Sequence, residues 1–185
     1  MTEYFTKGLV LSRDDRGEFD GVFSIYTKDF GKIRATARSV RRIKSKLSPH
    51  LSIGNFADLR IIKNNNYQIV DAFSFDKSKL NQRKLKFIEF IEQMTPDESQ
   101  DHHLWYGIDY VLSNNLIGKG GSDNDEFEHK IYRRFLEIFG FGAKFARCGN
   151  CGSKDIVYFI PPDIMFLCLK SSRFLAIKEE DAIKI

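Results

Sequence analysis

No apolar run in the sequence approaches the roughly 20 residues that a helix needs to span a bilayer. The opening residues, MTEYFTKGLVLSR, also lack the basic and then apolar layout of a secretory signal peptide. We therefore expect a chain without a membrane span and place it in the cytoplasm.

Cysteine is scarce, with three residues in a chain of 185, and an odd count in a reducing compartment does not predict a disulfide framework. Cys148 and Cys151 form a Cys-x-x-Cys-Gly stretch like half of a zinc ribbon, and Cys168 follows. A second knuckle would need a ligand at Ser171, where a hydroxyl is a poor zinc ligand. Two interpretations stay open: one structural zinc ion with its fourth ligand missing, or a ribbon-shaped hairpin without metal.

The sequence also lacks the usual signatures of catalysis. No carboxylate pair, nucleophile–base pair or phosphate-binding loop stands out. The glycine-rich stretch 118–123 follows no strand and has no Gly-Lys-Ser/Thr pattern, which is typical of a connector. We predict that the chain is not an enzyme and has no catalytic residues.

Apolar residues make up 42% of the chain and include 17 phenylalanines, enough for a folded interior. A chain of this length holds at most two compact modules. Turn residues separate five strand-like runs, 5–12, 19–28, 32–40, 56–62 and 67–75. Five strands with an insert between the third and fourth match an OB-type β-barrel, and an SH3-like barrel fits almost as well.

After residue 76 the apolar residues recur at helical spacing, which predicts helices over 80–94, 97–113 and 124–139. Gly140 is a stop signal, and a strand-like stretch lies at 156–160. We therefore predict an α+β protein with an N-terminal five-stranded OB-type β-barrel over residues 1–76. A small α-helical domain over 77–185 follows, with a zinc-ribbon-like hairpin at about residues 146–172.

Basic residues concentrate in the segment KIRATARSVRRIKSK, residues 32–46, which has no acidic residue. They are Lys32, Arg34, Arg38, Arg41, Arg42, Lys44 and Lys46. If the segment begins as a strand, Ile33, Ala35 and Ala37 face one side and the first basic residues face the other. These outward-facing basic residues form a ridge of positive charge. We expect no nearby acidic group of the chain to neutralise this ridge, whereas a polyphosphate backbone would. The segment therefore predicts a nucleic-acid interface, and its arginines suit both phosphates and stacked bases.

The alternative for this segment is a solvated basic face that deters edge-to-edge strand pairing. A second basic group either continues the nucleic-acid path or is a solvated helix face. It comprises Lys77, Lys79, Arg83, Lys84 and Lys86.

Several aromatic residues are candidates for stacking on unpaired bases, although we expect most of them to fill the barrel. They are Tyr4, Phe5, Phe23, Tyr26, Phe30, Tyr67 and Phe73.

Three stretches of the sequence form a pattern that a known family shares. The first consists of Gly8-Leu9-Val10-Leu11, Glu18, Thr27 and Gly31-Lys32, and the second of Ala37-Arg38-Ser39, Arg41-Arg42 and Lys44-Ser45. The third runs from Ile131 to Cys151, where a helix ending in Gly-Phe leads to the Cys-x-x-Cys-Gly knuckle. Through these stretches, and over nearly its whole length, the sequence resembles the RecO family of bacterial recombination mediators, which carries Ala-Lys-Gly, a basic group and a Lys-Ser pair at the second stretch.

The resemblance implies an N-terminal OB-fold, a helical domain with a zinc-ribbon-like insertion, and a task without bond chemistry. RecO-like proteins bind single- and double-stranded DNA and anneal complementary strands. With RecR, they help to load recombinase onto strands coated by single-stranded DNA-binding protein (SSB), whose C-terminal tail is a further implied partner. The implied setting is recombinational repair of DNA damage at the nucleoid.

Three features depart from the family pattern. Ser39 replaces a glycine, so we expect a less sharp turn there. Ser171 replaces the fourth cysteine and leaves the metal site one ligand short. The chain also stops soon after the hairpin, where the family adds helices, so we expect a reduced member or a fragment that lacks part of the SSB-tail site.

Two other functions stay open at this point. Small barrels with basic strands also bind RNA, so an RNA-binding factor is one alternative. The other is an adaptor whose barrel contacts acidic protein tails. Competition between matched DNA and RNA strands separates the first from a DNA-binding protein, and titration with an acidic peptide tests the second.

Overall fold

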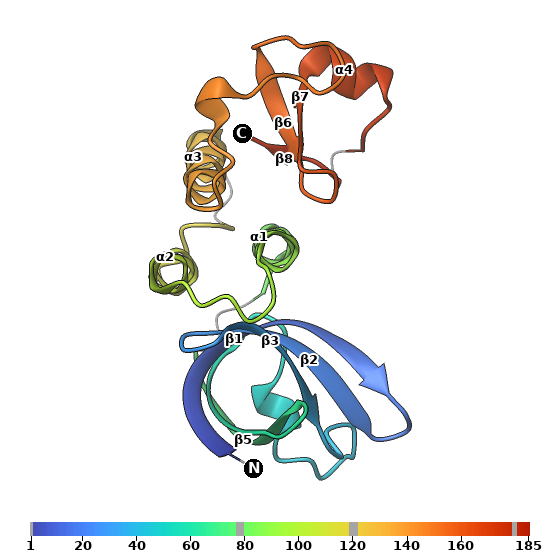
Figure 1. Ribbon diagram of the computed structural model, residues 1–185, viewed down its shortest axis with the longest axis vertical. Helices are drawn as coiled ribbons and strands as arrows, with labels where there is room; N and C mark the ends of the chain where they lie inside the picture. The colour runs from blue at the N-terminus through green and yellow to red at the C-terminus, as the bar shows by residue number, and fades with distance from the viewer. Residues whose placement is uncertain (1, 77–79, 119–121, 179–180) are drawn as a thin grey trace. The chain divides into compact units, whose positions relative to one another are not determined.

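The computed structural model of the protein describes residues 2–76, 80–118, 122–178 and 181–185 (Figure 1). The chain divides into two compact units, Met1–Gly118 and Lys119–Ile185, which are described separately below. Within the described residues, no helix is both long enough and apolar enough to cross a membrane.

Five strands of the first unit form a closed barrel in the order β1-β2-β3-β5-β4 (Figure 1). The strands are β1 (Thr2–Arg16), β2 (Asp20–Thr27), β3 (Gly31–Ala37), β4 (Phe56–Lys63) and β5 (Tyr67–Asp76). Neighbours are antiparallel except β3 and β5, which pair in parallel. The predicted five strands are confirmed, but the first runs on to Arg16 and the third already ends at Ala37.

β1 closes the barrel because it pairs with two strands. Its first half is paired with β4 and its second half with β2, and the two registers overlap at Gly8 and Leu9. Neighbouring side chains approach closely there, since a Cβ on Gly8 would lie 2.6 Å from Ile25 Cγ2 and 2.7 Å from Leu59 Cδ1. A bulge between Val10 and Ser12 then lets the long strand bend from one partner to the other.

The barrel interior is filled by alternate residues of its strands. In β3, Ile33, Ala35 and Ala37 are buried while Arg34 is exposed, which confirms the predicted alternation. The same core contains Val10, Phe23, Ile25, Val40, Leu51, Leu59, Ile61 and Ile69. Basic side chains on β3 are thus displayed outward by a strand that is fixed by its apolar residues.

The insert between β3 and β4 forms a turn and a short 3-10 helix, η1 (Ser48–His50). Ser39 has a φ of +52°, the left-handed conformation that favours glycine. Its N–H donates a hydrogen bond to Asp20 Oδ1 at 2.7 Å. The expected loosening of this turn is therefore wrong, because the hydrogen bond holds the sharp turn although Ser39 is not a glycine.

Two helices of the first unit follow the barrel, α1 (Gln82–Met94) and α2 (His102–Ser113). Each begins at a side-chain cap: Asn81 accepts from the Lys84 N–H, and Asp101 accepts from the Leu104 N–H. Both predicted helices are confirmed, although the second begins later than the apolar pattern indicated.

α2 packs onto the barrel through one large side chain. The Trp105 ring stacks 6.4 Å from the Tyr26 ring and meets the Phe56 ring edge-on at 5.9 Å. All three side chains are buried. This aromatic contact holds α2 to the barrel and makes the helix part of the barrel unit.

The second unit begins with α3 (Ser122–Ile138) and contains a three-stranded sheet in the order β7-β6-β8. Its other elements are η2 (Ala143–Phe145), β6 (Ile156–Ile160), β7 (Met165–Cys168), α4 (Leu169–Phe174) and β8 (Ile183–Lys184). β6 and β7 form an antiparallel hairpin, and β8 pairs with the other edge of β6. The helix over 124–139 and the strand over 156–160 are confirmed, whereas α4 and β8 are too short to show a period in the sequence.

Candidate nucleic-acid interface and cysteine cluster

β3 carries the first basic residues outward, but Lys32 is engaged within the chain. Its Nζ donates to the Glu92 carbonyl oxygen at 2.9 Å and lies 3.3 Å from Asp97 Oδ1, and the side chain is only 15% exposed. A cation is favourable at the last turn of α1 because the helix dipole is negative there. Lys32 therefore holds α1 to the barrel, in a position where it offers little to a ligand.

Two arginines of the segment also have acidic neighbours, so the expectation that nothing in the chain neutralises the ridge is wrong. Arg34 lies 3.3 Å from Asp14 Oδ2, and Arg41 lies 3.3 Å from Asp15 Oδ2. Both acidic residues lie at the end of β1, beyond residue 12, where the sequence pattern predicted that the first strand ends. Both pairs are solvent-accessible, and such pairs contribute only about 0–1 kcal/mol, so a phosphate can compete for these arginines.

The remaining cations of the segment are exposed. Arg38, Lys44 and Lys46 form no ion pair within the described part of the chain. Arg42 places its guanidinium 4.8 Å from the centre of the Phe19 ring, at the tip of the β1–β2 hairpin. Arg41 reaches the same tip, where it donates to the Gly17 carbonyl oxygen at 3.1 Å.

Arg38 directly follows Ala37, which pairs with Gly21 at the start of β2, so its backbone lies beside the same hairpin. We call Arg38, Arg41 and Arg42 the arginine surface. Lys44 and Lys46 follow in the loop after it. Of the second basic group, Lys77 and Lys79 lie outside the described residues. Lys84 is buried and donates to Asn115 Oδ1 at 2.6 Å, so it is not part of a surface path.

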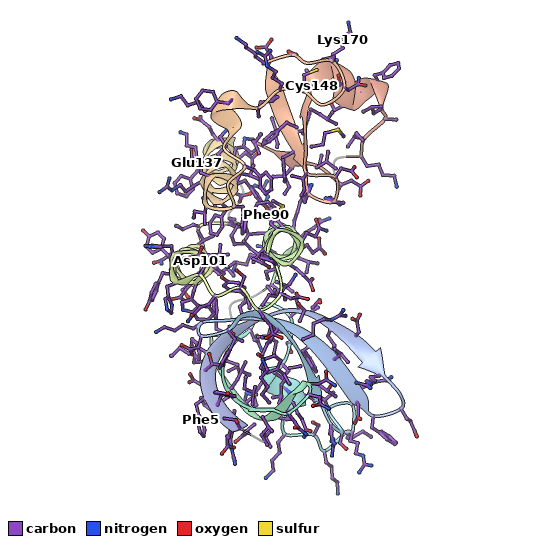
Figure 2. All side chains as sticks on the ribbon, viewed as in Figure 1. Phe5, Phe90, Asp101, Glu137, Cys148 and Lys170 are labelled. Carbon is purple, nitrogen blue, oxygen red and sulfur yellow. The ribbon has the colours of Figure 1, made fainter. Side chains whose placement is uncertain are left out.

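A groove of about 550 Å³ lies on the outer face of β1, β4 and β5. Phe5 and Phe73 line it and are 75% and 66% exposed. Figure 2 shows Phe5 on the outer side of the barrel. The expectation that most candidate rings fill the interior is confirmed, because Phe23 and Tyr67 lie in the barrel core and Tyr4 and Phe30 pack against it. Tyr26 is buried against Trp105 of α2, and the exposed Phe5 and Phe73 are the exceptions.

Strand alternation is the signal that separates the two exposed rings from the buried ones. Thr6 and Ala72, their neighbours in sequence, are buried, so Phe5 and Phe73 must point to the other side of their strands. Aromatic composition alone did not show this, because it carries no information about which face a ring takes.

Cys148, Cys151 and Cys168 come together in the second unit. Their Sγ atoms all lie within 4.8 Å of one another, and those of Cys151 and Cys168 are 3.6 Å apart. Cys148 and Cys168 are buried, and Cys151 is exposed. A tetrahedral site with Zn–S bonds of about 2.3 Å separates its sulfurs by about 3.8 Å, so the three thiols are compatible with one zinc ion.

Ser171 lies beside the three thiols, at the start of α4. Its N–H donates to Cys168 Sγ at 3.4 Å, and its Oγ lies 3.4 Å from the same sulfur. Asn150 Nδ2 donates to Ser171 Oγ at 3.1 Å. The residue that stands in place of a fourth cysteine is therefore buried next to the cluster, as its position in the knuckle pattern predicted.

Local hydrogen bonds favour the thiolate form of two of these cysteines. Burial by itself raises the pKa of Cys148, but hydrogen bonds with the Ser171 side chain and with the backbone of Cys168, Cys151 and Asn150 lower it to about 6. The side chain and backbone of Ser171 also lower the pKa of Cys168. Because the thiolate is the metal ligand, the knuckle is prepared for a cation near neutral pH.

Together these features define a class: a small closed-barrel protein with an arginine-bearing outer surface, followed in sequence by a unit with a three-cysteine knuckle. Comparison with known families agrees with that description. The family model described as Recombination protein O N terminal matches residues 1–76, which contain all five strands of the barrel.

Curated relatives extend the match beyond the barrel. The chain is 36% identical to the DNA repair protein RecO of Cutibacterium acnes over 166 residues, 83% of this chain and 67% of that protein. It is 25% identical over 178 residues to the RecO of Dehalococcoides mccartyi (strain ATCC BAA-2266 / KCTC 15142 / 195), covering 90% and 69% of the two chains. The RecO of Caldicellulosiruptor bescii is 26% identical over 190 residues, covering 97% and 74%. The chain belongs to the RecO family of DNA repair proteins.

Proposed function

We propose that this chain is a DNA-binding recombination mediator that holds DNA on the arginine surface of an OB-type barrel. The observation that carries the proposal is the position of Arg38, Arg41 and Arg42 beside the β1–β2 hairpin. OB-folds bind oligonucleotides on the face of strands 2 and 3 and on the loop between strands 1 and 2. The arginine surface occupies that region of this barrel.

Phosphates can replace the acidic neighbours of this surface at small cost. The Arg41–Asp15 pair is accessible to solvent and contributes little by itself, so exchanging the carboxylate for a phosphate loses little energy. Each phosphate contact releases condensed counterions, which adds affinity that falls as salt rises. Arg34, Lys44 and Lys46 extend the same contact, whereas Lys32 contributes through the position of α1.

The proposed task is to bind and anneal DNA and to help load recombinase onto SSB-coated single strands, without bond chemistry. Family membership supports this task, with RecR and the SSB C-terminal tail as protein partners and the cytoplasmic nucleoid as the place of action. We propose residues 1–76 as the DNA-binding domain and 77–185 as the partner-docking domain. α1 and α2 belong to the second of these by sequence, although they pack within the barrel unit.

We further propose that the zinc-ribbon-like hairpin over about residues 146–172 holds one structural zinc ion through Cys148, Cys151 and Cys168. The sulfur spacing and the lowered pKa of Cys148 support it. Ser171 leaves the fourth position to its own hydroxyl or to a water molecule. Such a site stabilises the hairpin less than four thiolates would.

The test of DNA binding is the triple variant Arg38→Ala/Arg41→Ala/Arg42→Ala. We expect weaker binding to single and double strands of any sequence, and a salt slope reduced by about 2 to 3 because up to three phosphate contacts are lost. Fluorescence anisotropy across a salt series measures both quantities.

The matched control removes the same charge from exposed positions of α3, with Lys130, Arg133 and Arg134 replaced by alanine. We expect this control to bind as the unchanged protein does. Equal affinity of the arginine-surface variant and the unchanged protein would contradict the proposal. A marked preference for RNA in competition with matched DNA would instead favour an RNA-binding factor.

A further inference from the structure

The backbone of the second unit brings its three cysteines together. The Gly152 N–H donates to the Cys148 carbonyl oxygen at 2.8 Å, which closes the knuckle. The Gly149 N–H donates to the Phe166 carbonyl oxygen at 2.9 Å and ties the knuckle to β7. Because β7 ends at Cys168, these bonds hold the Cys168 thiol beside the knuckle.

Cys151 and Cys168 have their sulfurs in van der Waals contact, with the two Sγ atoms 3.6 Å apart. A disulfide bond is about 2.05 Å long, so a side-chain movement of about 1.5 Å brings this pair to bonding distance. Cys151 is exposed and Cys168 is buried. A small oxidant in solution therefore reaches Cys151 first and finds a second thiol directly behind it.

Two side chains of the unit fix the buried partner. Cys168 ends β7 and caps α4, where its Sγ accepts the Ser171 N–H at 3.4 Å. Asn150, from the knuckle, donates through Nδ2 to Ser171 Oγ at 3.1 Å. The knuckle and the start of α4 are thus joined on both sides of the Cys151–Cys168 pair, which keeps the two sulfurs facing each other.

We propose that Cys151 and Cys168 form a reversible disulfide on exposure to hydrogen peroxide, which makes the hairpin a site of thiol oxidation. Disulfides in a reducing compartment are usually transient and act in catalysis or redox sensing, and a contacting pair with one exposed member suits that use. The disulfide itself needs neither DNA nor a metal ion. Only its consequence for zinc rests on the proposed metal site.

The oxidation takes two steps. The Cys151 thiolate attacks one peroxide oxygen, so that an S–O bond forms, the O–O bond breaks and hydroxide leaves, giving a sulfenic acid. The Cys168 thiolate then attacks the Cys151 sulfur, the S–S bond forms, the S–O bond breaks and a second hydroxide leaves. The two sulfurs lose two electrons and the peroxide gains them, while the thiol protons end in water.

The disulfide changes what the hairpin can bind. It joins the knuckle covalently to the start of α4 and encloses β6 and β7 in the resulting loop. Because the thiolate is the metal ligand, the bond also removes two of the three ligands proposed for zinc. The oxidised hairpin and the zinc-bound hairpin are therefore alternative states of one site.

The test treats the whole chain with a chelator and then with hydrogen peroxide, alkylates the remaining thiols with iodoacetamide, and maps the peptides by mass spectrometry. We expect the loss of two of the three thiols and of two hydrogen atoms, a Cys151–Cys168 link, and an alkylated Cys148. Dithiothreitol should restore all three thiols. Chain unfolded in concentrated urea is the reference, and there we expect the Cys148–Cys151 link, because loop closure favours the pair nearest in sequence.

The matched control variant is Cys148→Ser, which keeps the proposed pair and should still lose both of its thiols. In Cys148→Ser/Cys168→Ser, Cys151 has no partner, so its sulfenic acid should accumulate and be trapped by dimedone. A Cys148–Cys151 link in the folded protein would overturn the inference. So would three thiols that survive peroxide, or two that survive it in Cys148→Ser.

Zinc added before the peroxide separates this inference from the proposed metal site. We expect bound zinc to protect both thiols, because its ligands are the same two sulfurs. Equal oxidation with and without zinc, together with a Cys151–Cys168 link, would contradict the metal site and support the disulfide.

Discussion

Single residues at the turns decide how closely the segments of the barrel unit pack. Gly31 has a φ of +69°, and a Cβ there would lie 2.1 Å from the carbonyl oxygen of Ser99. At the same contact, the Lys32 carbonyl oxygen accepts a hydrogen bond from the Glu98 N–H at 2.8 Å. The start of β3 and the segment before α2 are thus in backbone contact, which a side chain at Gly31 would break.

We predict that Gly31→Ala lowers the free energy of unfolding by about 3 kcal/mol, because left-handed strain adds to the clash with Ser99. Gly17→Ala is the matched control: its φ is +61°, but a Cβ there meets nothing within 4 Å, so about 1 kcal/mol of strain is expected alone. Urea denaturation measures both. Equal losses of unfolding free energy in the two variants would show that the close approach of Gly31 to Ser99 does not contribute to stability.

The burial or exposure of a side chain was predictable from the sequence where the residue's own strand decides it. It was not predictable where a distant segment of the chain decides it. The burial of Ile33 and the exposure of Arg34 follow from strand alternation. The hydrogen bond and ion pair of Lys32 do not, because its partners Glu92 and Asp97 lie some sixty residues along the chain. The contact of Lys32 with α1 becomes evident only from the packing of that helix on the barrel.

At the scale of elements, period and turn chemistry predicted the five strands and the three long helices. The bulge and double pairing of β1 were not predictable, because register depends on both partners of a strand. This extension of β1 brings Asp14 and Asp15 to the basic segment, and its omission led to the wrong expectation of an unneutralised ridge. The Cys148–Cys151 knuckle was predictable because its two cysteines are close in sequence.

The cysteine hairpin offers a test by gain of function. Ser171→Cys places a fourth thiol next to Cys168, where the hydroxyl now lies 3.4 Å from the sulfur. We predict tighter zinc binding, by at least about tenfold, because four thiolates form a closed tetrahedral structural site. Competition with a chromophoric chelator measures the affinity, and the unfolding temperature of the zinc-bound form should rise with it.

The matched control is Ser172→Cys, one residue along α4, where the replaced hydroxyl donates to the Leu169 carbonyl oxygen and not to the cysteine cluster. Equal zinc affinity of Ser171→Cys and the unchanged protein would argue against a metal at this hairpin.

At the scale of the whole molecule, two units carry two kinds of site. The barrel unit presents the arginine surface and the aromatic groove, and the second unit presents the cysteine knuckle. We propose that the arginine surface contacts phosphates in both single- and double-stranded DNA.

The measurement that tests the central claim most directly is the annealing of two complementary, fluorescently labelled DNA strands, with and without an SSB coating, across a salt series. The account predicts that the protein accelerates annealing at low salt, that the acceleration fades as salt rises, and that Arg38→Ala/Arg41→Ala/Arg42→Ala loses most of it. No acceleration at low salt, or equal acceleration by the triple variant, would contradict DNA handling by the arginine surface.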